Sequence, residues 1–223
     1  MASQSAAAPG FEIIPPNPPN DGILFVDHSL ANRSGHLGHA LVEYEPGRIL
    51  AFYANCSDAN KGHCADGWME FKRSLDAGAT WSEPMDFAHA KRLYDDGQRA
   101  SAFCEKAVLA PDGAIVVTTL ECDLQTNPGW HPHYAPLSLR STDGGDTWEE
   151  PVPVSDEPGR VYDMLRIGDE ILALEFCNDT AENFVGTRPE HVYTLYVSGD
   201  SGRSFSPRST LPFDTEGRGY GTM

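Results

Sequence analysis

A short segment that occurs three times constrains the fold of this chain more than any other feature of its sequence. The octapeptides SLDAGATW, STDGGDTW and SGDSGRSF begin at residues 74, 141 and 198. The recurring residues are Ser74, Asp76, Gly78 and Trp81, then Ser141, Asp143, Gly145 and Trp148, and then Ser198, Asp200 and Gly202. The third copy has Ser and Phe where the first two have Thr and Trp. A repeat of this kind predicts a fold built from several copies of one structural unit.

The chemistry of the octapeptide predicts a tight turn. Its Asp carboxylate can accept hydrogen bonds from backbone N–H groups that follow it, as in an Asx-turn. Its Gly can adopt the left-handed conformation that a Cβ atom resists. The Ser and Thr hydroxyls can tie the two ends together, and the Trp can begin a strand and pack into the core. We therefore expect three equivalent structural turns.

Each octapeptide lies at the same place in a repeated pattern of short apolar-rich runs. The expected strands are 39–44, 48–53, 69–74 and 81–87 in the first unit, 102–109, 114–120 and 137–141 in the second, and 160–167, 170–176 and 191–198 in the third. Such runs, separated by turn signals such as Pro-Asp-Gly, indicate antiparallel strands. Because four strands make one propeller blade, the sequence predicts an all-β propeller.

The repeat also sets the expected domain boundaries. Residues 1–34 form an N-terminal extension, and the blades cover about 35–90, 91–155 and 156–213, with the start of a further blade at 214–223. Propellers usually contain four to eight blades. We therefore expect a partial chain, or self-association that completes the ring.

The octapeptide is identified as the Asp-box, or BNR, repeat, and residues 35–223 resemble the sialidase (neuraminidase) superfamily. The resemblance implies a six-bladed propeller and a glycoside hydrolase that cleaves terminal sugars from glycoconjugates, as an exo-α-sialidase does. Asp-boxes also occur in propellers with other functions, so the motif indicates the fold more strongly than the activity.

The resemblance further implies a catalytic set of three arginines, an acid/base Asp and a Tyr–Glu nucleophile. The Arg-Ile-Pro motif that opens the first inner strand in the family is replaced here by Leu-Gly-His-Ala-Leu at 37–41. Arg33 or His36 would have to substitute for the missing arginine. Asp66 is the nearest candidate for the acid/base, and the remaining groups would lie beyond Met223.

Strand alternation places the long loops on the face opposite the octapeptides. These loops are expected at 55–67, 121–135 and 177–190, and at 88–100, 153–159 and 213–218. Long loops that converge on one rim usually carry binding and catalysis. The candidate catalytic residues are Asp66, His39 and His63, and the candidate substrate-binding residues are Arg33, His36, Arg92, Tyr94, Arg99, Glu105, His131, His133 and Tyr134.

Two other functions fit the same rim. Its His and Tyr residues could serve as base and acid in a lyase or glycosidase that acts on uronic-acid polysaccharides. Alternatively, the propeller could bind carbohydrate without catalysis, with Trp130, His133 and Tyr134 as a stacking platform.

Composition disfavours two classes of partner, and the resemblance implies a glycan. The net charge of −17 disfavours nucleic acid and anionic membranes. The five cysteines contain no CxxC pair, so no metal or cofactor is expected, and either buried thiols or a Cys56–Cys64 bridge accounts for them. The N-terminus lacks the pattern of a secretory signal, which indicates a cytoplasmic protein unless the N-terminus was trimmed from a secreted one.

Overall fold

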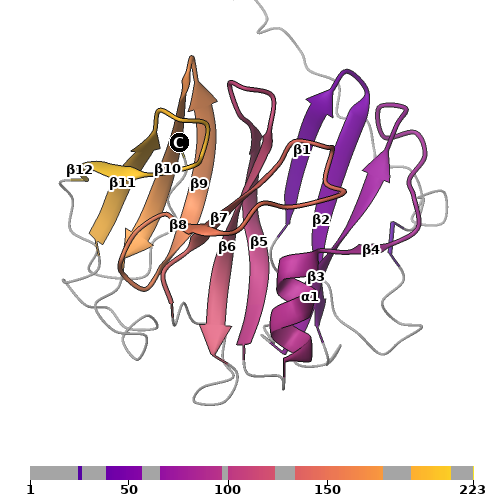
Figure 1. The fold of residues 1–223 in the computed structure, drawn as a ribbon, viewed down its shortest axis with the longest axis horizontal. Coiled ribbons are helices and arrows are strands. Elements are labelled where there is room, and N and C mark those ends of the chain that lie inside the picture. The colour runs from indigo at the N-terminus through magenta and orange to yellow at the C-terminus, as the bar shows by residue number, and fades with distance from the viewer. Residues whose placement is uncertain are drawn as a thin grey trace, which may run out of the picture.

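A computed structural model describes residues 25–26, 39–56, 66–96, 100–123, 134–177, 192–211 and 223. In this part of the chain, twelve strands form three four-stranded antiparallel sheets. Strands that are consecutive in the sequence are neighbours in each sheet, and the innermost strands of adjacent sheets contact one another. The three sheets stand side by side like the blades of a fan (Figure 1). The predicted all-β, propeller-type fold is confirmed.

The three sheets share one pattern of strands and one register. Each has an isoleucine of its second strand opposite the octapeptide serine, in the pairs Ile49–Ser74, Ile115–Ser141 and Ile171–Ser198. The first sheet consists of β1 (Ala40–Glu45), β2 (Arg48–Cys56), β3 (Gly67–Ser74) and β4 (Met85–Asp86). The second consists of β5 (Ala100–Leu109), β6 (Ile115–Asp123), β7 (Leu137–Ser141) and β8 (Val152–Pro153). The third consists of β9 (Gly159–Ile167), β10 (Glu170–Cys177), β11 (Val192–Ser198) and β12 (Ser206–Thr210).

The three octapeptides form the same hydrogen-bonded turn. In the second, the Ser141 hydroxyl oxygen accepts the Gly145 N–H at 2.8 Å, and the Asp143 carboxylate accepts the N–H of Thr147 at 2.9 Å and its hydroxyl at 2.5 Å. The equivalent distances are 2.8, 2.8 and 2.6 Å in the first turn and 2.7, 2.9 and 2.6 Å in the third. The side-chain roles expected from the sequence are therefore present in each turn.

Two consecutive residues of each turn have left-handed backbone. The conserved glycines have φ angles of 86°, 90° and 84° at Gly78, Gly145 and Gly202, as predicted. The preceding residue is also left-handed, and only the second turn has glycine there, whereas the first has Ala77 (φ 57°) and the third Ser201 (φ 63°). Because a Cβ atom disfavours this region, the first and third turns hold a locally costly conformation that the rest of the turn stabilises.

Each of the second and third turns rests on the sheet that precedes it. A Cβ atom on Gly145 would lie 2.8 Å from Leu50 Cδ1, and one on Gly202 would lie 2.9 Å from Val116 Cγ1. Leu50 and Val116 occupy the same position in β2 and β6, one residue after the isoleucine that faces the octapeptide serine. The glycine therefore serves two purposes, since it permits the turn and it lets the preceding sheet approach closely.

Arginines reinforce the contact between sheets. Arg73, at the end of β3, donates from Nη2 to the Gly144 carbonyl at 2.8 Å and to Asp146 at 2.6 Å. Arg140, at the equivalent place in β7, donates to the Ser201 carbonyl of the third turn and pairs with Asp112 at 3.0 Å. The same arrangement thus joins the first sheet to the second and the second to the third.

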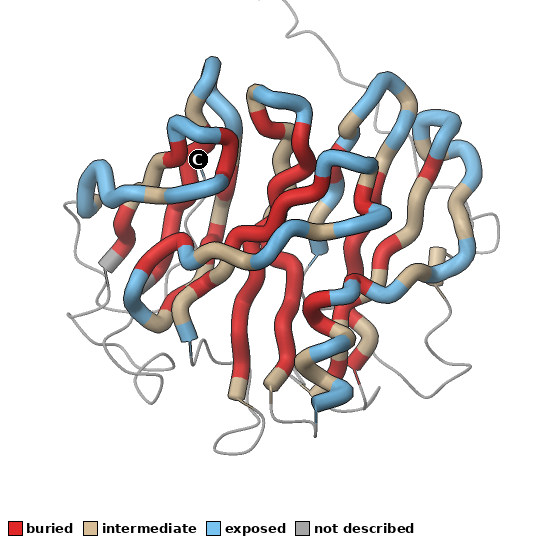
Figure 2. Tube along the Cα trace, viewed as in Figure 1, coloured by how far each residue is buried: buried red, intermediate tan, exposed pale blue. Residues whose placement is uncertain are grey.

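Most strand residues in the middle of the molecule are buried (Figure 2), and apolar side chains form clusters that join neighbouring sheets. The core between the first and second sheets contains Phe52 and Phe87, and the Trp148 ring lies 6.0 and 5.0 Å from their ring centroids. The core between the second and third sheets contains Val116 and Val161, against which Phe205 packs. The aromatic residue that ends the second and third octapeptides is therefore partly buried and packs against the core, as expected.

Two expectations about the segments after the first octapeptide are wrong. The expected strand at 81–87 is reduced to Met85–Asp86, so Trp81 does not begin a strand. The expected loop at 88–100 contains a helix, α1 (Ala88–Asp95). Good helix formers fill this segment, no Gly or Pro interrupts it, and Lys91 pairs with Asp95 one turn later at 2.6 Å.

Cys56, Cys104 and Cys122 are buried, whereas Cys64 lies outside the described residues. Across the ranges that the structure describes, no helix is long and apolar enough to cross a membrane. In those same ranges, no three His, Cys, Asp or Glu side chains are placed to share a metal ion.

Replacement of the octapeptide aspartate should destabilise the fold in a pH-dependent way. Asp143→Ala removes the acceptor for both Thr147 donors, and we expect the free energy of unfolding in urea to fall by roughly 1–2 kcal/mol. Asp169→Ala, in the exposed β9–β10 turn, is the control. Hydrogen bonds from Thr147 lower the pKa of Asp143 from 3.8 to about 2.

Because the folded state favours the ionised carboxylate, this stabilisation is present above pH 3.8. The advantage of the wild type over Asp143→Asn should therefore shrink as the pH falls from about 4 toward 2. A constant difference across this range would contradict the assignment.

Candidate functional site

The strand order separates two ends of the molecule. The β1–β2, β5–β6 and β9–β10 turns lie at the same end as the octapeptide turns, as antiparallel order requires. The other end holds the starts of β5 and β9, the ends of β6 and β10, and α1 (Figure 1). This is the end that strand alternation predicted to carry the long loops, and buried charged groups gather toward it.

Three buried glutamates are the main chemical feature of the second and third sheets. Glu105 on β5, Glu121 on β6 and Glu175 on β10 are 6%, 5% and 0% exposed. A buried carboxylate is costly unless it is hydrogen-bonded or paired. Each of the three has a hydrogen-bond or ion-pair partner, and we call these three residues the glutamate cluster.

Glu105 forms a bidentate ion pair that joins two sheets. Its carboxylate accepts from Arg160 Nη2 at 2.6 Å and from Nε at 2.9 Å. Glu105 lies at a bulge in β5, and Arg160 is the second residue of β9, so the pair links neighbouring inner strands. The Arg160 guanidinium carbon also lies 4.8 Å from the centroid of the Tyr162 ring.

Arg160 keeps its positive charge although its side chain is largely buried. Burial favours the neutral form, but the charges of Glu105 and Tyr162 and the hydrogen bonding to Glu105 together outweigh it and raise the pKa of Arg160. The ion pair and the aromatic ring hold the planar guanidinium in one orientation.

Glu121 connects α1 of the first sheet to β6 of the second. Its Oε1 atom accepts the Thr119 hydroxyl at 2.6 Å and lies 3.1 Å from His89 Nε2. His89 is the second residue of α1 and is 7% exposed. The helix that the sequence did not predict therefore positions an imidazole against a buried carboxylate.

Tyr134 lies near the same carboxylate but is accessible. It is 48% exposed, and burial together with the charges of Asp123 and Glu121 raises the pKa of its phenol. Negative charge nearby disfavours the phenolate. The raised pKa keeps the Tyr134 phenol protonated and makes it a weaker acid than a free tyrosine.

Glu175 is enclosed by the segment that precedes β9. It accepts the Ser155 hydroxyl at 2.8 Å, and a Cβ atom on Gly159 would overlap with its carboxylate. Burial of Glu175 thus requires glycine at the start of β9.

The structure describes half of the predicted site residues and places them in different surroundings. Glu105 and Tyr134 belong to the region of the glutamate cluster. Arg92 and Tyr94 lie on α1, where the Tyr94 ring packs 5.1 Å from the Trp68 ring. Asp66 and His39 directly precede β3 and β1. The predicted residues that lie outside the described ranges are His63, Arg33, His36, Arg99, His131 and His133.

The sequence reasoning missed Arg160, Tyr162 and Ser155, and it placed His89 on the rim without a role. Arg160 carries one usable signal, since it is a charged residue within an apolar-rich run, as Glu105 is. Two opposite charges on equivalent inner strands could have suggested a pair, but the choice of partner depends on the contact between sheets.

Comparison with known proteins identifies the fold. No family model and no curated protein matches the sequence. Among solved structures, this chain is similar to a protein of unknown function from Dyadobacter fermentans, with 17% identity, a TM-score of 0.58, and coverage of 82% of this chain and 56% of that one. It is also similar to the intramolecular trans-sialidase from Ruminococcus gnavus, with 9% identity, a TM-score of 0.52, and coverage of 81% and 55%.

A weaker match, with a TM-score of 0.48 and 16% identity, is to a polysaccharide lyase that acts on ulvan, over 80% of this chain and 42% of that one. The chain thus spans about half the length of the structures that it matches. At these identities the similarity shows a sialidase-like propeller fold and nothing finer.

A double-mutant cycle on the Glu105–Arg160 pair should show strong coupling. Removal of one member leaves a buried charge without its partner, so Glu105→Ala and Arg160→Ala should each cost about 3 kcal/mol or more of unfolding free energy. The double variant should cost less than the sum, with a coupling of about 2 kcal/mol.

Glu170 and Arg208 provide a matched control, because they form the same bidentate contact, at 2.6 and 2.9 Å, on the exposed surface. Water screens that pair, so its coupling should be clearly smaller. Equal coupling for the two pairs would show that burial does not strengthen the Glu105–Arg160 contact.

Proposed function

We propose that this propeller is glycan-active and acts as a hydrolase that removes terminal acidic sugars from glycoconjugates, in the manner of an exo-α-sialidase. The observation that carries the proposal is the arginine fixed at the junction of two inner strands. Glu105 and Tyr162 orient its guanidinium through a bidentate ion pair and a ring contact. Because Glu105 binds the Nε and Nη2 edge, in this proposal the other edge of the oriented guanidinium would meet the sugar carboxylate.

For binding an acidic sugar, the orientation of the Arg160 N–H groups matters more than the net charge of the chain. The chain as a whole carries −17, which would repel an acidic sugar at long range. At close range, an arginine that is already ordered loses little conformational entropy when it binds a ligand. In this proposal Glu105 is a positioning residue, because it acts through Arg160.

The fold supports the same proposal. The Ruminococcus gnavus structure is an intramolecular trans-sialidase, and its similarity to this chain is one of fold. Since related folds carry many activities, the proposal depends on the arginine and not on the fold alone. Asp66, His39 and the predicted residues outside the described ranges stay candidates for the catalytic groups.

A second candidate function is a lyase or glycosidase that acts on uronic-acid polysaccharides. The observation that favours it is the position of Tyr134, which is 48% exposed and lies near the Asp123 and Glu121 carboxylates. In the elimination a base takes the C5 proton of the uronate, a role for which His39 stays a candidate. The Tyr134 hydroxyl gives its proton to the leaving oxygen as the C4–O bond breaks and the C4–C5 double bond forms. A β-elimination of this kind leaves an unsaturated uronate, whereas hydrolysis consumes water and leaves none.

For the hydrolase, the test is release of the fluorophore from 4-methylumbelliferyl N-acetylneuraminic acid by the full chain. Arg160→Lys keeps the charge but loses the bidentate fork, so kcat/KM should fall by about 100-fold. Arg208→Lys makes the same change in the exposed pair and should leave kcat/KM unchanged. An active protein that is indifferent to Arg160→Lys would overturn the role of this arginine.

For the lyase, the test is the ultraviolet absorbance of unsaturated uronate after incubation with polymers such as ulvan or polyglucuronate. Tyr134→Phe removes the proton donor and should lower kcat by about 100-fold or more. Tyr44→Phe, which changes a tyrosine on the octapeptide face beside Gly144, is the control. Fluorophore release without unsaturated product would exclude this candidate, and the reverse result would exclude the hydrolase.

A further inference from the structure

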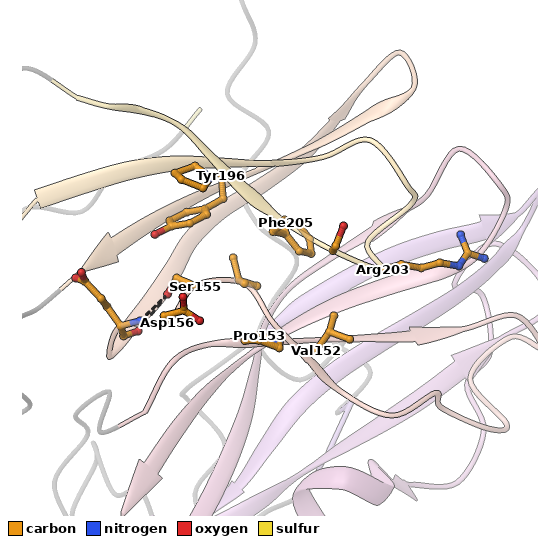
Figure 3. A pocket seen from close by; sticks show the side chains of 11 residues that line it. Val152, Pro153, Ser155, Asp156, Tyr196, Arg203 and Phe205 are labelled. Carbon is orange, nitrogen blue, oxygen red and sulfur yellow. Dashed lines mark hydrogen bonds between the residues drawn. The ribbon is translucent and has the colours of Figure 1, made fainter.

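Two grooves at the outer edges of the sheets are built from equivalent positions of the repeat. The first, of about 440 Å³, lies between α1 and the second sheet, and the second, of about 490 Å³, lies between residues 152–157 and the third sheet (Figure 3). Both are lined by the residue two positions before the octapeptide serine and by the last three residues of the octapeptide. These residues are Leu139, Asp146, Thr147 and Trp148 in the first groove and Tyr196, Arg203, Ser204 and Phe205 in the second. The grooves are therefore two versions of one site.

The second groove differs from the first at the positions that matter for binding. Tyr196 stands where the first groove has Leu139, and Pro207 stands where it has Glu150. Compared with the first groove, the second groove therefore has an additional aromatic ring and hydroxyl, from Tyr196, and lacks the carboxylate of Glu150. Figure 3 shows the Tyr196 and Phe205 rings on one side of the cavity and Ser155, Asp156 and Pro153 on the other.

The wall opposite the aromatic rings is rigid. The Ser155 hydroxyl donates to Glu175 at 2.8 Å, and its oxygen accepts the Glu157 N–H at 3.3 Å. The Val154 N–H donates to the Pro136 carbonyl at 2.9 Å. A wall held in this way loses little entropy on binding, which distinguishes it from an ordinary surface loop.

Negative charge dominates the polar rim of the second groove. Asp156 and Glu157 are exposed carboxylates on the rigid wall. The one cation that lines the groove, Arg203, is engaged elsewhere, at 3.0 Å from Asp112 and 2.9 Å from the Asp200 carbonyl. The rim therefore offers hydrogen-bond acceptors and repels anions.

We propose that the second groove is a binding site for a neutral pyranose sugar. One face of a pyranose presents C–H groups, which pack against aromatic rings such as Tyr196 by dispersion. Its edge presents hydroxyls, which donate to carboxylates such as Asp156 and Glu157. The volume lies within the roughly 300–1,000 Å³ of small-molecule sites.

The second groove differs in chemistry from the proposed site at Arg160. At the Arg160 site a fixed guanidinium suits an acidic sugar, whereas in the second groove the carboxylates of Asp156 and Glu157 repel an acidic sugar. A glycan-active protein with both sites would hold the neutral part of a glycan at the outer edge of the propeller. The binding site does not depend on the proposed activity, because it is tested by direct binding.

The experiment is saturation-transfer NMR and isothermal titration on the full chain with maltose, cellobiose and lactose as probes. At least one of these should bind with a millimolar Kd, and its pyranose ring C–H protons should receive the strongest transfer. Tyr196→Leu, which installs the residue of the first groove, should weaken binding at least tenfold. Asp156→Asn, an exposed change that leaves the fold intact, should weaken it at least threefold.

The control is Glu150→Gln, which alters the first groove and should leave binding unchanged. The proposal is overturned if none of the three sugars binds, or if binding survives both Tyr196→Leu and Asp156→Asn. It is also overturned if N-acetylneuraminic acid binds at this groove as well as the neutral sugars do, or if tetramethylammonium binds there and the sugars do not. Should Tyr196→Leu fail to fold, Asp156→Asn decides the outcome.

Discussion

The close contact between an octapeptide glycine and the preceding sheet is the interaction on which the rest of this structure depends. Gly145 and Gly202 have no Cβ atom, so Leu50 and Val116 can pack directly against the turns. The same turns receive Arg73 and Arg140 from the preceding sheet. Because the contact recurs in the same register, it sets the spacing of successive sheets and brings their innermost strands together.

That spacing has two chemical consequences. At the inner edge, it places Glu105 and Arg160 of neighbouring strands within reach of each other, and burial makes their ion pair strong enough to fix a guanidinium. At the outer edge, it leaves a groove between each pair of sheets, lined by the residues that follow the turn. One repeated contact therefore generates both a buried ion pair between inner strands and a groove with acceptor groups at the outer edge.

Much of the fold could be predicted from the sequence, and much less of the site. The turns, nine of the twelve strands and the face opposite the octapeptides followed from local pattern. Helix α1 was missed because the repeat suggested a loop there, although the local residues favour a helix. Glu105 was recognised as a charged residue in an inner strand, but its partner was not.

The sequence by itself determined the number, place and chemistry of the turns, because every hydrogen bond that defines a turn joins residues at most four positions apart. Only the tertiary structure decided which charges meet. Arg160 and Glu105 are 55 residues apart, and His89 and Glu121 are 32 residues apart. Such pairs depend on a strand bulge, an unexpected helix and the distance between sheets, and these follow from packing between units rather than from pattern within one.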